Sequence, residues 1–187
     1  CRRGDVETGD TVLVTGAGPI GLMILEAARA AGATDVILTD VVDEKLTFAR
    51  ERGADLTVNV AEDDLEAAVE AYTDGAGADV VVEASGAASS IESTLDVVCR
   101  GGTIVLVGLA SEATVPFDVL DLIDNELDVL GSFRYKNTYP AAIDLLADAV
   151  VDVEGIVELE SSLEDIDDAF QRAMNPNVVK GMVTLES

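Results

Sequence analysis

Short β-branched runs alternate along the chain with stretches in which apolar residues recur every three or four positions. The first type is typical of buried strands and the second of helices that pack on a sheet. The expected strands are residues 12–14, 35–40, 56–60, 80–83, 103–107 and 127–131. The expected helices are residues 19–31, 43–52, 64–72, 89–98 and a short one from about residue 119. Ser89 and Glu92 are expected to form a capping box at the start of the fourth helix. This alternation predicts an α/β fold with a doubly wound parallel sheet in the order 3-2-1-4-5-6.

Three glycines follow the first expected strand in the spacing G-x-G-x-x-G, as the helix at residues 19–31 begins. Gly16 permits a tight turn, Gly18 lets a pyrophosphate approach the backbone, and Gly21 lets the helix lie close to the strand. Free N–H groups and the positive end of the helix then face the phosphates. The motif therefore predicts a Rossmann nucleotide-binding site.

An acidic residue lies where such a site needs one. Asp40 ends the second expected strand, 19 residues beyond Gly21, at the position that binds the adenosine ribose hydroxyls. The alternative is that the glycines form an ordinary turn and that Asp40 is a solvated strand end. We prefer the nucleotide site because strand, glycines, helix, second strand and acid all occur in register.

The chain has 37 acidic and 11 basic residues, giving a formal net charge of −26. This sign argues against a nucleic-acid partner, because phosphate recognition needs a basic surface. The acids are interleaved with apolar residues, so a disordered acidic tail is not expected. A halophilic source is the simplest explanation, since high salt screens self-repulsion while dense carboxylates keep the surface hydrated.

The two cysteines, Cys1 and Cys99, are far apart in the sequence, and Cys99 falls in an expected buried helix. We therefore expect no structural disulfide and a reducing, cytoplasmic compartment. No apolar run reaches the roughly 18 residues of a membrane span, and no signal peptide is recognisable. A membrane partner is not expected.

The residues that usually assist hydride transfer are missing from the sequence. There is no histidine, and the two cysteines have no zinc-binding spacing. No tyrosine has a lysine four positions later, so the Tyr-x-x-x-Lys dyad of short-chain dehydrogenases is absent as well. We expect neither a catalytic group nor a metal ligand within this chain.

The chain continues beyond the sixth expected strand with residues that a dinucleotide domain does not require. A helix is expected at residues 139–149, an extended segment at 155–160, a helix at 161–174 with a capping box at Ser161 and Glu164, and a last strand at 178–185. We expect residues 1–136 to form the NAD-binding Rossmann domain. Residues 137–187 would then return toward a neighbouring catalytic domain.

Four motifs together resemble the C-terminal half of zinc-dependent medium-chain dehydrogenases, most closely the sorbitol (L-iditol)/xylitol dehydrogenase group. They are Cys-Arg-Arg-Gly at the start, Gly-Ala-Gly-Pro-Ile-Gly from residue 16, Val-Gly-Leu from residue 107, and Phe-Arg-Tyr-Lys-Asn-Thr from residue 133. The glycine motif is widespread in that superfamily, whereas Phe-Arg-Tyr-x-Asn-Thr is narrower and indicates polyols. The resemblance covers essentially the whole chain.

The resemblance implies specific contacts with NAD and with a small polyol or other alcohol. The implied cofactor-binding residues are Gly16, Gly18, Pro19, Ile20, Gly21, Asp40, Lys45, Val107, Gly108, Leu109, Ser132, Phe133 and Arg134. Arg134 and Tyr135 would also reach the substrate hydroxyls. Lys45 replaces an arginine usual in that group, so it keeps the charge but loses planar bidentate contacts.

Each of these assignments has a simpler alternative. Residues 107–109 can be a plain strand end and turn, Lys45 a cation on a helix surface, and Arg134 a partner for one of the many acids. The motif order favours function for residues 107–109 and for Arg134 and Tyr135. For Lys45 the two interpretations are evenly balanced.

By resemblance, the full enzyme transfers a hydride from a secondary alcohol to NAD and is a homo-oligomer. Its catalytic zinc, with Cys, His and Glu ligands, would lie in an N-terminal domain preceding Cys1, so this chain alone is expected to be inactive. Two alternatives stay open. One is an L-threonine or sugar dehydrogenase of the same superfamily, and the other is a stand-alone NAD-binding or redox-sensing module without catalysis.

Overall fold

The computed structural model describes residues 1–135, 137–175 and 177–185. The chain divides into two compact units, Cys1–Val151 and Asp152–Ser187. Lys136 of the motif at residues 133–138 lies outside the described residues, as do Glu186 and Ser187 at the end of the expected C-terminal segment. The expected domain boundary after residue 136 stays a prediction.

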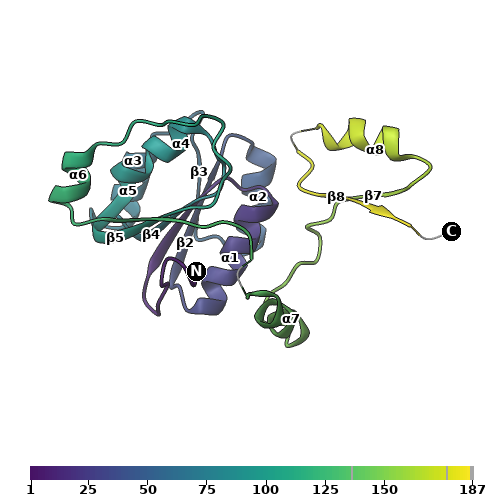
Figure 1. Cartoon of the computed structure of the whole chain (residues 1–187), viewed down its shortest axis with the longest axis horizontal. Helices are drawn as coiled ribbons and strands as arrows, with labels where there is room; N and C mark the ends of the chain where they lie inside the picture. Colours follow the sequence, from purple (N-terminus) through teal and green to yellow (C-terminus); the bar gives the residue numbers. More distant parts are fainter. Residues whose placement is uncertain (136, 176, 186–187) are drawn as a thin grey trace. The chain divides into compact units, whose positions relative to one another are not determined.

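Unit 1 is built on a six-stranded parallel sheet (Figure 1). The strands are β1 (Thr11–Thr15), β2 (Asp35–Asp40), β3 (Leu56–Asn59), β4 (Ala78–Glu83), β5 (Val98–Leu106) and β6 (Asp128–Gly131). Their spatial order is β3-β2-β1-β4-β5-β6, so the Rossmann topology predicted from the sequence is confirmed. The strand order reverses between β1 and β4, and ligands of such sheets bind beyond the carboxyl ends of the strands at this point.

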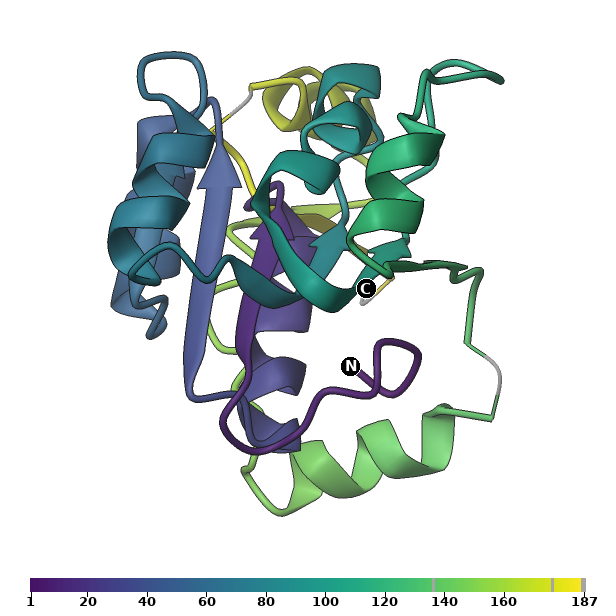
Figure 2. The same ribbon diagram turned by 90° about the vertical axis from the view of Figure 1, so that its left-hand side faces the viewer.

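Helices cover both faces of the sheet. Helices α1 (Pro19–Ala31) and α2 (Asp43–Glu51) lie on one face, as Figure 1 shows. The opposite face, turned toward the viewer in Figure 2, carries α3 (Leu65–Tyr72), α4 (Ala88–Glu92), α5 (Thr94–Val97) and α6 (Val119–Asp124). Unit 1 also contains α7 (Tyr139–Ala147). A core cluster joins strand residues Leu13, Ile37, Val81 and Ile104 to helix residues that include Val69 and Val97.

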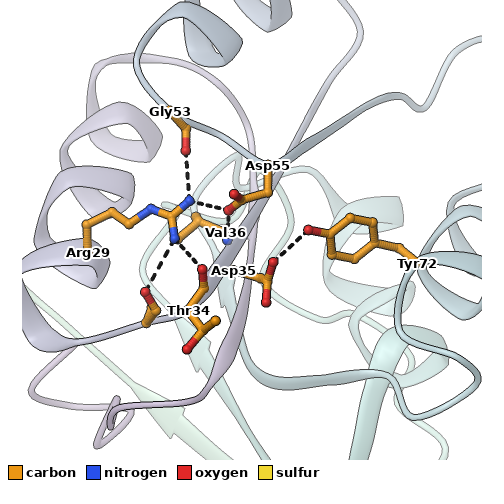
Figure 3. Close-up of polar contacts among 8 residues, drawn as sticks. Arg29, Thr34, Asp35, Val36, Gly53, Asp55 and Tyr72 are labelled. Carbon is orange, nitrogen blue, oxygen red and sulfur yellow. Dashed lines mark hydrogen bonds and ion pairs between the residues drawn. The ribbon is translucent and has the colours of Figure 1, made fainter.

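A network around Arg29 fixes the end of α1 to the segments that lead into β2 and β3 (Figure 3). Its guanidinium donates to the carbonyls of Ala33, Thr34 and Gly53 and pairs with the carboxylate of Asp55. The same Asp55 oxygen accepts the backbone N–H of Val36 at 2.7 Å. Arginine suits this position because its planar fork presents several donors at once.

The structure corrects the expected helix at residues 89–98. The helix is divided into α4 and α5, and the expected capping box at Ser89 does not form, because Ala87 is the N-cap and makes no side-chain hydrogen bond. Strand β5 already begins at Val98, so Cys99 lies in a strand. The glycine pair at residues 101–102 lies inside β5 beside a shift in the β4–β5 register, where a Cβ at Gly102 would approach the carbonyl of Cys99 to 2.9 Å.

Unit 2 contains a small parallel sheet, formed by β7 (Leu159–Ser162) and β8 (Gly181–Thr184), and α8 (Ile166–Ala173). The expected capping box at Ser161 is wrong. The helix begins at residue 166, and its N-cap is Asp165. The Asp165 carboxylate accepts a hydrogen bond from the Ser162 hydroxyl at 2.9 Å. Leu159, Ala169 and Val179 are buried within this unit. Across the described part of both units, no helix has the length and apolar character that crossing a membrane requires.

Candidate dinucleotide-binding site

The glycine turn lies between β1 and α1 in the conformation that its sequence predicts. Gly16 has a φ of +89°, in the left-handed region that glycine favours. Its N–H donates to the carbonyl of Thr39 at 2.7 Å, which ties the turn to the end of β2. Gly21 is buried in the first turns of α1, where that helix approaches β1. The turn therefore joins the ends of two neighbouring strands.

Gly18 is the N-cap of α1, and Pro19 begins the helix. Among the residues that the structure describes, no side chain caps the helix, and no atom lies within 4 Å of the position that a Cβ at Gly18 would take. Pro19 is well placed at the first helical position because it lacks an N–H that would be unpaired there. The backbone is thus open to an anionic ligand at the N-terminus of a 13-residue helix, which fits the pyrophosphate of a dinucleotide.

Asp40, at the carboxyl end of β2, is held in one orientation by the backbone. One carboxylate oxygen accepts the N–H of Ala17, within the glycine turn, at 2.8 Å. The other accepts the N–H groups of Val41 at 2.8 Å and Val42 at 3.1 Å. The side chain is half-buried, so its free lone pairs are available to hydroxyl donors at the edge of the turn.

Asp40 and Gly16 both line a pocket of about 410 Å³ at this end of the sheet. Its volume falls within the range of small-molecule sites and suits part of a dinucleotide. Val41, Val60 and Leu65 contribute apolar surface. Six hydroxyl side chains line it as well: Thr15, Thr39, Ser85, Ser89, Ser90 and Ser93. The pocket thus combines an apolar wall with polar groups that can orient a ligand.

Two other predicted cofactor-binding residues, Ile20 and Lys45, do not line this pocket. Ile20 lies in the first turn of α1 with 55% of its surface exposed. Lys45 is half-buried in the first turn of α2 and does not line the pocket. Its role as a cofactor-binding residue stays a prediction.

The predicted nicotinamide-end residues follow β5. Val107 and Gly108 both donate their N–H groups to the carbonyl of Glu83, at 2.8 and 2.9 Å. Leu109 is 81% exposed. Ser132, just after β6, donates its N–H to the carbonyl of Leu106 at 2.9 Å. The ends of β4, β5 and β6 are therefore tied together, although residues 107–109 lie outside the lining of the 410 Å³ pocket.

Phe133, Arg134 and Tyr135 continue from Ser132 as an exposed segment. The guanidinium carbon of Arg134 lies 4.9 Å from the centre of the Phe133 ring, a cation–π arrangement. Tyr135 packs edge-on against Tyr139 with ring centres 5.0 Å apart. Arg134 has a φ of +59°, which is strained for a non-glycine residue and is typical of functional loops.

Within the described residues, no three side chains of His, Cys, Asp or Glu gather closely enough to hold a metal ion. Cys99 lies near Asp79, with its sulfur 3.8 Å from a carboxylate oxygen. Burial, followed by the charge of Asp79, raises the pKa of the Cys99 thiol, which disfavours the thiolate that metals bind. The residues present therefore do not fit a zinc site.

Comparison with known proteins identifies the family. A family model described as zinc-binding dehydrogenase matches residues 19–148. The chain belongs to the zinc-binding dehydrogenase family. The match begins at the start of α1 and covers the segments that follow β5 and β6, as well as all of the pocket lining except Thr15 and Gly16.

Curated and solved relatives of this zinc-binding dehydrogenase chain are about twice its length. Sorbitol dehydrogenase from Bacillus subtilis is 39% identical over 172 residues, which are 92% of this chain and 49% of the relative. Alcohol dehydrogenase TADH from Thermus sp. ATN1 superposes with a TM-score of 0.93 at 28% identity, and the match covers 99% of this chain and 54% of the TADH chain. For 2R,3R-butanediol dehydrogenase from Bacillus subtilis the TM-score is 0.90 at 29% identity, and the match covers 99% of this chain and 53% of that enzyme. The chain spans about half the length of the curated relatives it matches.

Part of the site has no counterpart among the residues predicted from the sequence. Of the pocket serines, Ser89 is predicted only as a helix cap, and the sequence pattern does not single out Ser85, Ser90 or Ser93. The sequence pattern places Glu83 only at a strand end, yet its side chain is fully buried beside the glycine turn. A carboxylate at the carboxyl end of a strand next to the switch point is the signal that could have identified it.

Proposed function

We propose that the chain is the NAD-binding portion of an NAD-dependent, zinc-type dehydrogenase that oxidises a polyol or another secondary alcohol to a ketone. The observation that carries this proposal is the fixed carboxylate of Asp40, held by the N–H groups of Ala17, Val41 and Val42. A carboxylate fixed at this position can accept both adenosine ribose hydroxyls without losing further freedom on binding. Membership of the zinc-binding dehydrogenase family supports the same conclusion.

Each part of the site has a task in this proposal. Asp40 orients the ribose in the pocket, and the open backbone at Gly18 with the N-terminus of α1 receives the pyrophosphate. Residues 107–109 and Ser132 hold the nicotinamide end beyond β5 and β6. When bound, NAD accepts the hydride from the alcohol carbon.

The polyol assignment rests on the segment at residues 133–135. Arg134 offers several N–H donors and Tyr135 a phenolic hydroxyl, and both side chains are exposed beyond β6. Such groups suit a substrate with several hydroxyls. The sorbitol dehydrogenase from Bacillus subtilis, with 39% identity, supports this class over an L-threonine or sugar substrate.

We propose that the zinc and its ligands belong to a part of the enzyme outside this chain, and that residues 137–187 extend toward that part. Unit 2 leaves large apolar side chains uncovered within the unit: Phe170 is 66% exposed and Met174 is 76% exposed. Exposed apolar groups of this kind mark a surface that another part of the protein covers. The relatives, twice as long, support this arrangement.

The proposal also covers the cellular compartment, the salt adaptation and the oligomeric state of the enzyme. The free thiols of Cys1 and Cys99 support a reducing, cytoplasmic compartment. The net charge of −26 supports a salt-adapted surface and argues against nucleic-acid partners. We further propose that the complete enzyme is a homo-oligomer, as its family resemblance implies.

Calorimetric titration with NAD in molar salt tests the proposed cofactor. The unmodified chain is expected to bind NAD, and Asp40→Asn to bind it about tenfold more weakly because one held acceptor is lost. Asp144→Asn is the matched control, since Asp144 lies exposed on α7 and outside the pocket. Absence of NAD binding by the unmodified chain, or equal affinity of Asp40→Asn, would overturn the proposal.

A further inference from the structure

Glu83 is a fully buried carboxylate at the carboxyl end of β4, beside the strand-order reversal. One oxygen, Oε1, accepts four hydrogen bonds. The donors are the Thr15 hydroxyl at 3.2 Å, the Ser85 N–H at 2.9 Å, the Ser85 hydroxyl at 2.6 Å and the Gly86 N–H at 2.8 Å. A single side chain thus holds the turn at residues 85–86 and attaches it to β1.

The two hydroxyls in this network are themselves fixed by the backbone. Thr15 Oγ1 accepts the N–H of Ala84 at 3.2 Å, and Ser85 Oγ accepts the N–H of Ala87 at 3.1 Å. Each hydroxyl therefore donates to Glu83 and accepts from the chain that follows β4. Hydrogen bonds to a carboxylate are stronger than those between neutral groups, so this arrangement is rigid.

The turn held by Glu83 lies directly against the segment after β5. Gly86 has a φ of +75°, and a Cβ there would stand 2.3 Å from the carbonyl oxygen of Leu109. A Cβ at Gly108 would stand 2.4 Å from the Gly86 nitrogen. The carbonyl of Gly86 also accepts the N–H of Ser111 at 3.1 Å. Any movement of the turn must therefore displace residues 108–111.

The second carboxylate oxygen, Oε2, is buried without a hydrogen-bond partner among the described residues. It faces Gly108, since a Cβ built there would lie 2.6 Å from it. A buried polar atom left unpaired costs free energy, and such atoms in native structures are associated with functional sites. Glu83 thus contacts both the turn and the back of the segment proposed to hold the nicotinamide.

We propose that Glu83 is a positioning residue for the nicotinamide half of the cofactor, acting through the turn at residues 85–86 and through Gly108. This inference rests on the proposed function. It separates the site into two parts: Asp40 determines how tightly the adenosine half binds, and Glu83 determines where the nicotinamide end lies.

The test compares ADP-ribose, which lacks nicotinamide, with NADH, whose fluorescence reports the surroundings of the nicotinamide ring. In Glu83→Gln, the amide N–H groups either replace the acceptor of the four donors and disrupt the turn, or lie buried beside Gly108, where Oε2 has no partner among the described residues. We expect an affinity for ADP-ribose within about twofold of the unmodified chain and an affinity for NADH at least about fivefold lower. The NADH fluorescence change on binding should shrink in parallel. Glu92→Gln, on the exposed side of α4, is the charge-matched control.

Gly108→Ala is the second variant, because its methyl group enters the same contact from the segment after β5. It is expected to give the same pattern, and it decides the question if Glu83→Gln does not fold. Equal losses of ADP-ribose and NADH affinity would indicate a merely structural role and overturn the inference. Unchanged NADH affinity and fluorescence would overturn it too. Failure of the unmodified chain to bind either ligand would refute the proposed function instead.

Discussion

Gly21 lies so close to Gly16 that a Cβ at position 21 would stand 1.8 Å from the carbonyl oxygen of Gly16. That oxygen belongs to backbone, which cannot move aside without opening the turn. Gly21→Ala is therefore expected to destabilise the fold by about 1–3 kcal/mol, as overpacked core positions do. Thermal melts of the two proteins in the same salt check this.

Gly18→Ala is the matched substitution for Gly21→Ala. Its methyl group has no atom of the described residues within 4 Å, and the φ of −76° at this position suits alanine, so the melting temperature should not fall. The methyl group would instead occupy the approach to the N-terminus of α1 and weaken NAD binding. A large loss of stability in Gly18→Ala, or none in Gly21→Ala, would contradict the roles assigned to the two glycines.

Asp40 leads to a prediction about cofactor choice. Its carboxylate can accept two ribose hydroxyls but would face the 2′-phosphate of NADP as a like charge. NAD should therefore bind at least about tenfold more tightly than NADP, which corresponds to roughly 1.4 kcal/mol. Calorimetric titration with both cofactors in molar salt measures the ratio, and equal affinities would refute this role of Asp40.

The predictable part of the molecule follows from local signals. Strand order follows from the alternation of strands and helices, and α1 begins and ends at the residues expected because Pro19 and Gly32 mark its ends. Gly16 and Asp40 also lie together as their spacing predicts, since both follow adjacent parallel strands. Such features need only short stretches of sequence and the known geometry of the fold.

Other features depend on contacts between distant residues. Glu83 and Thr15 are 68 positions apart, so nothing in the local pattern of either indicates their hydrogen bond. The glycine pair at residues 101–102 is a strong local turn signal, yet pairing with β4 draws it into β5. Tertiary pairing there overrides local preference. Likewise, Ser89 is predicted to be a helix cap from the local pattern, but in the fold it lines the pocket.

The chain alone is expected to bind NAD without turnover. It has no histidine, and its described residues gather no three side chains able to ligate a metal, so a developing alkoxide would lack a stabilising partner. Purified protein supplied with zinc, NAD and xylitol should give no absorbance rise from NADH. Steady turnover above that of Asp40→Asn would mean that a catalytic group has been overlooked.

Tyr72 gives a pH-dependent prediction. Its hydroxyl donates to Asp35 at 2.7 Å (Figure 3), and this hydrogen bond, with burial and the nearby negative charge, raises the pKa of Tyr72 to about 12 from the ordinary 10.0. The folded state then retains the proton that the unfolded state loses, so the stabilisation is complete below pH 10 and is lost as the pH rises toward 12. The shift itself is measured by tyrosinate absorbance, with Tyr72→Phe identifying the signal among three tyrosines. Asp35→Asn should return the Tyr72 pKa toward 10, and an unchanged titration in this variant would contradict the assignment.

The net charge predicts a steep dependence of stability on salt. Twenty-six uncompensated negative charges repel one another over a Debye length of about 10 Å at 0.1 M salt but only about 3 Å at 1 M. The melting temperature in KCl should therefore rise steeply up to about 1 M. A plateau there would indicate screening alone, whereas a further rise to several molar would indicate strengthened apolar burial or ion binding as well. A melting temperature that is constant from 0.1 to 4 M would contradict a salt-adapted surface.

The hydrogen bonds and ion pair of Arg29 matter especially in a chain with so few basic residues. One of only 11 basic residues serves three backbone carbonyls and a carboxylate on segments that precede two strands. Its bonds act at contact distance, where dissolved ions cannot enter between the partners, so added salt weakens them far less than it weakens charges separated by solvent. The segments that lead into β2 and β3 should therefore keep their geometry at both low and high salt. Changes in repulsion between the acidic surface residues would then leave this part of the sheet intact.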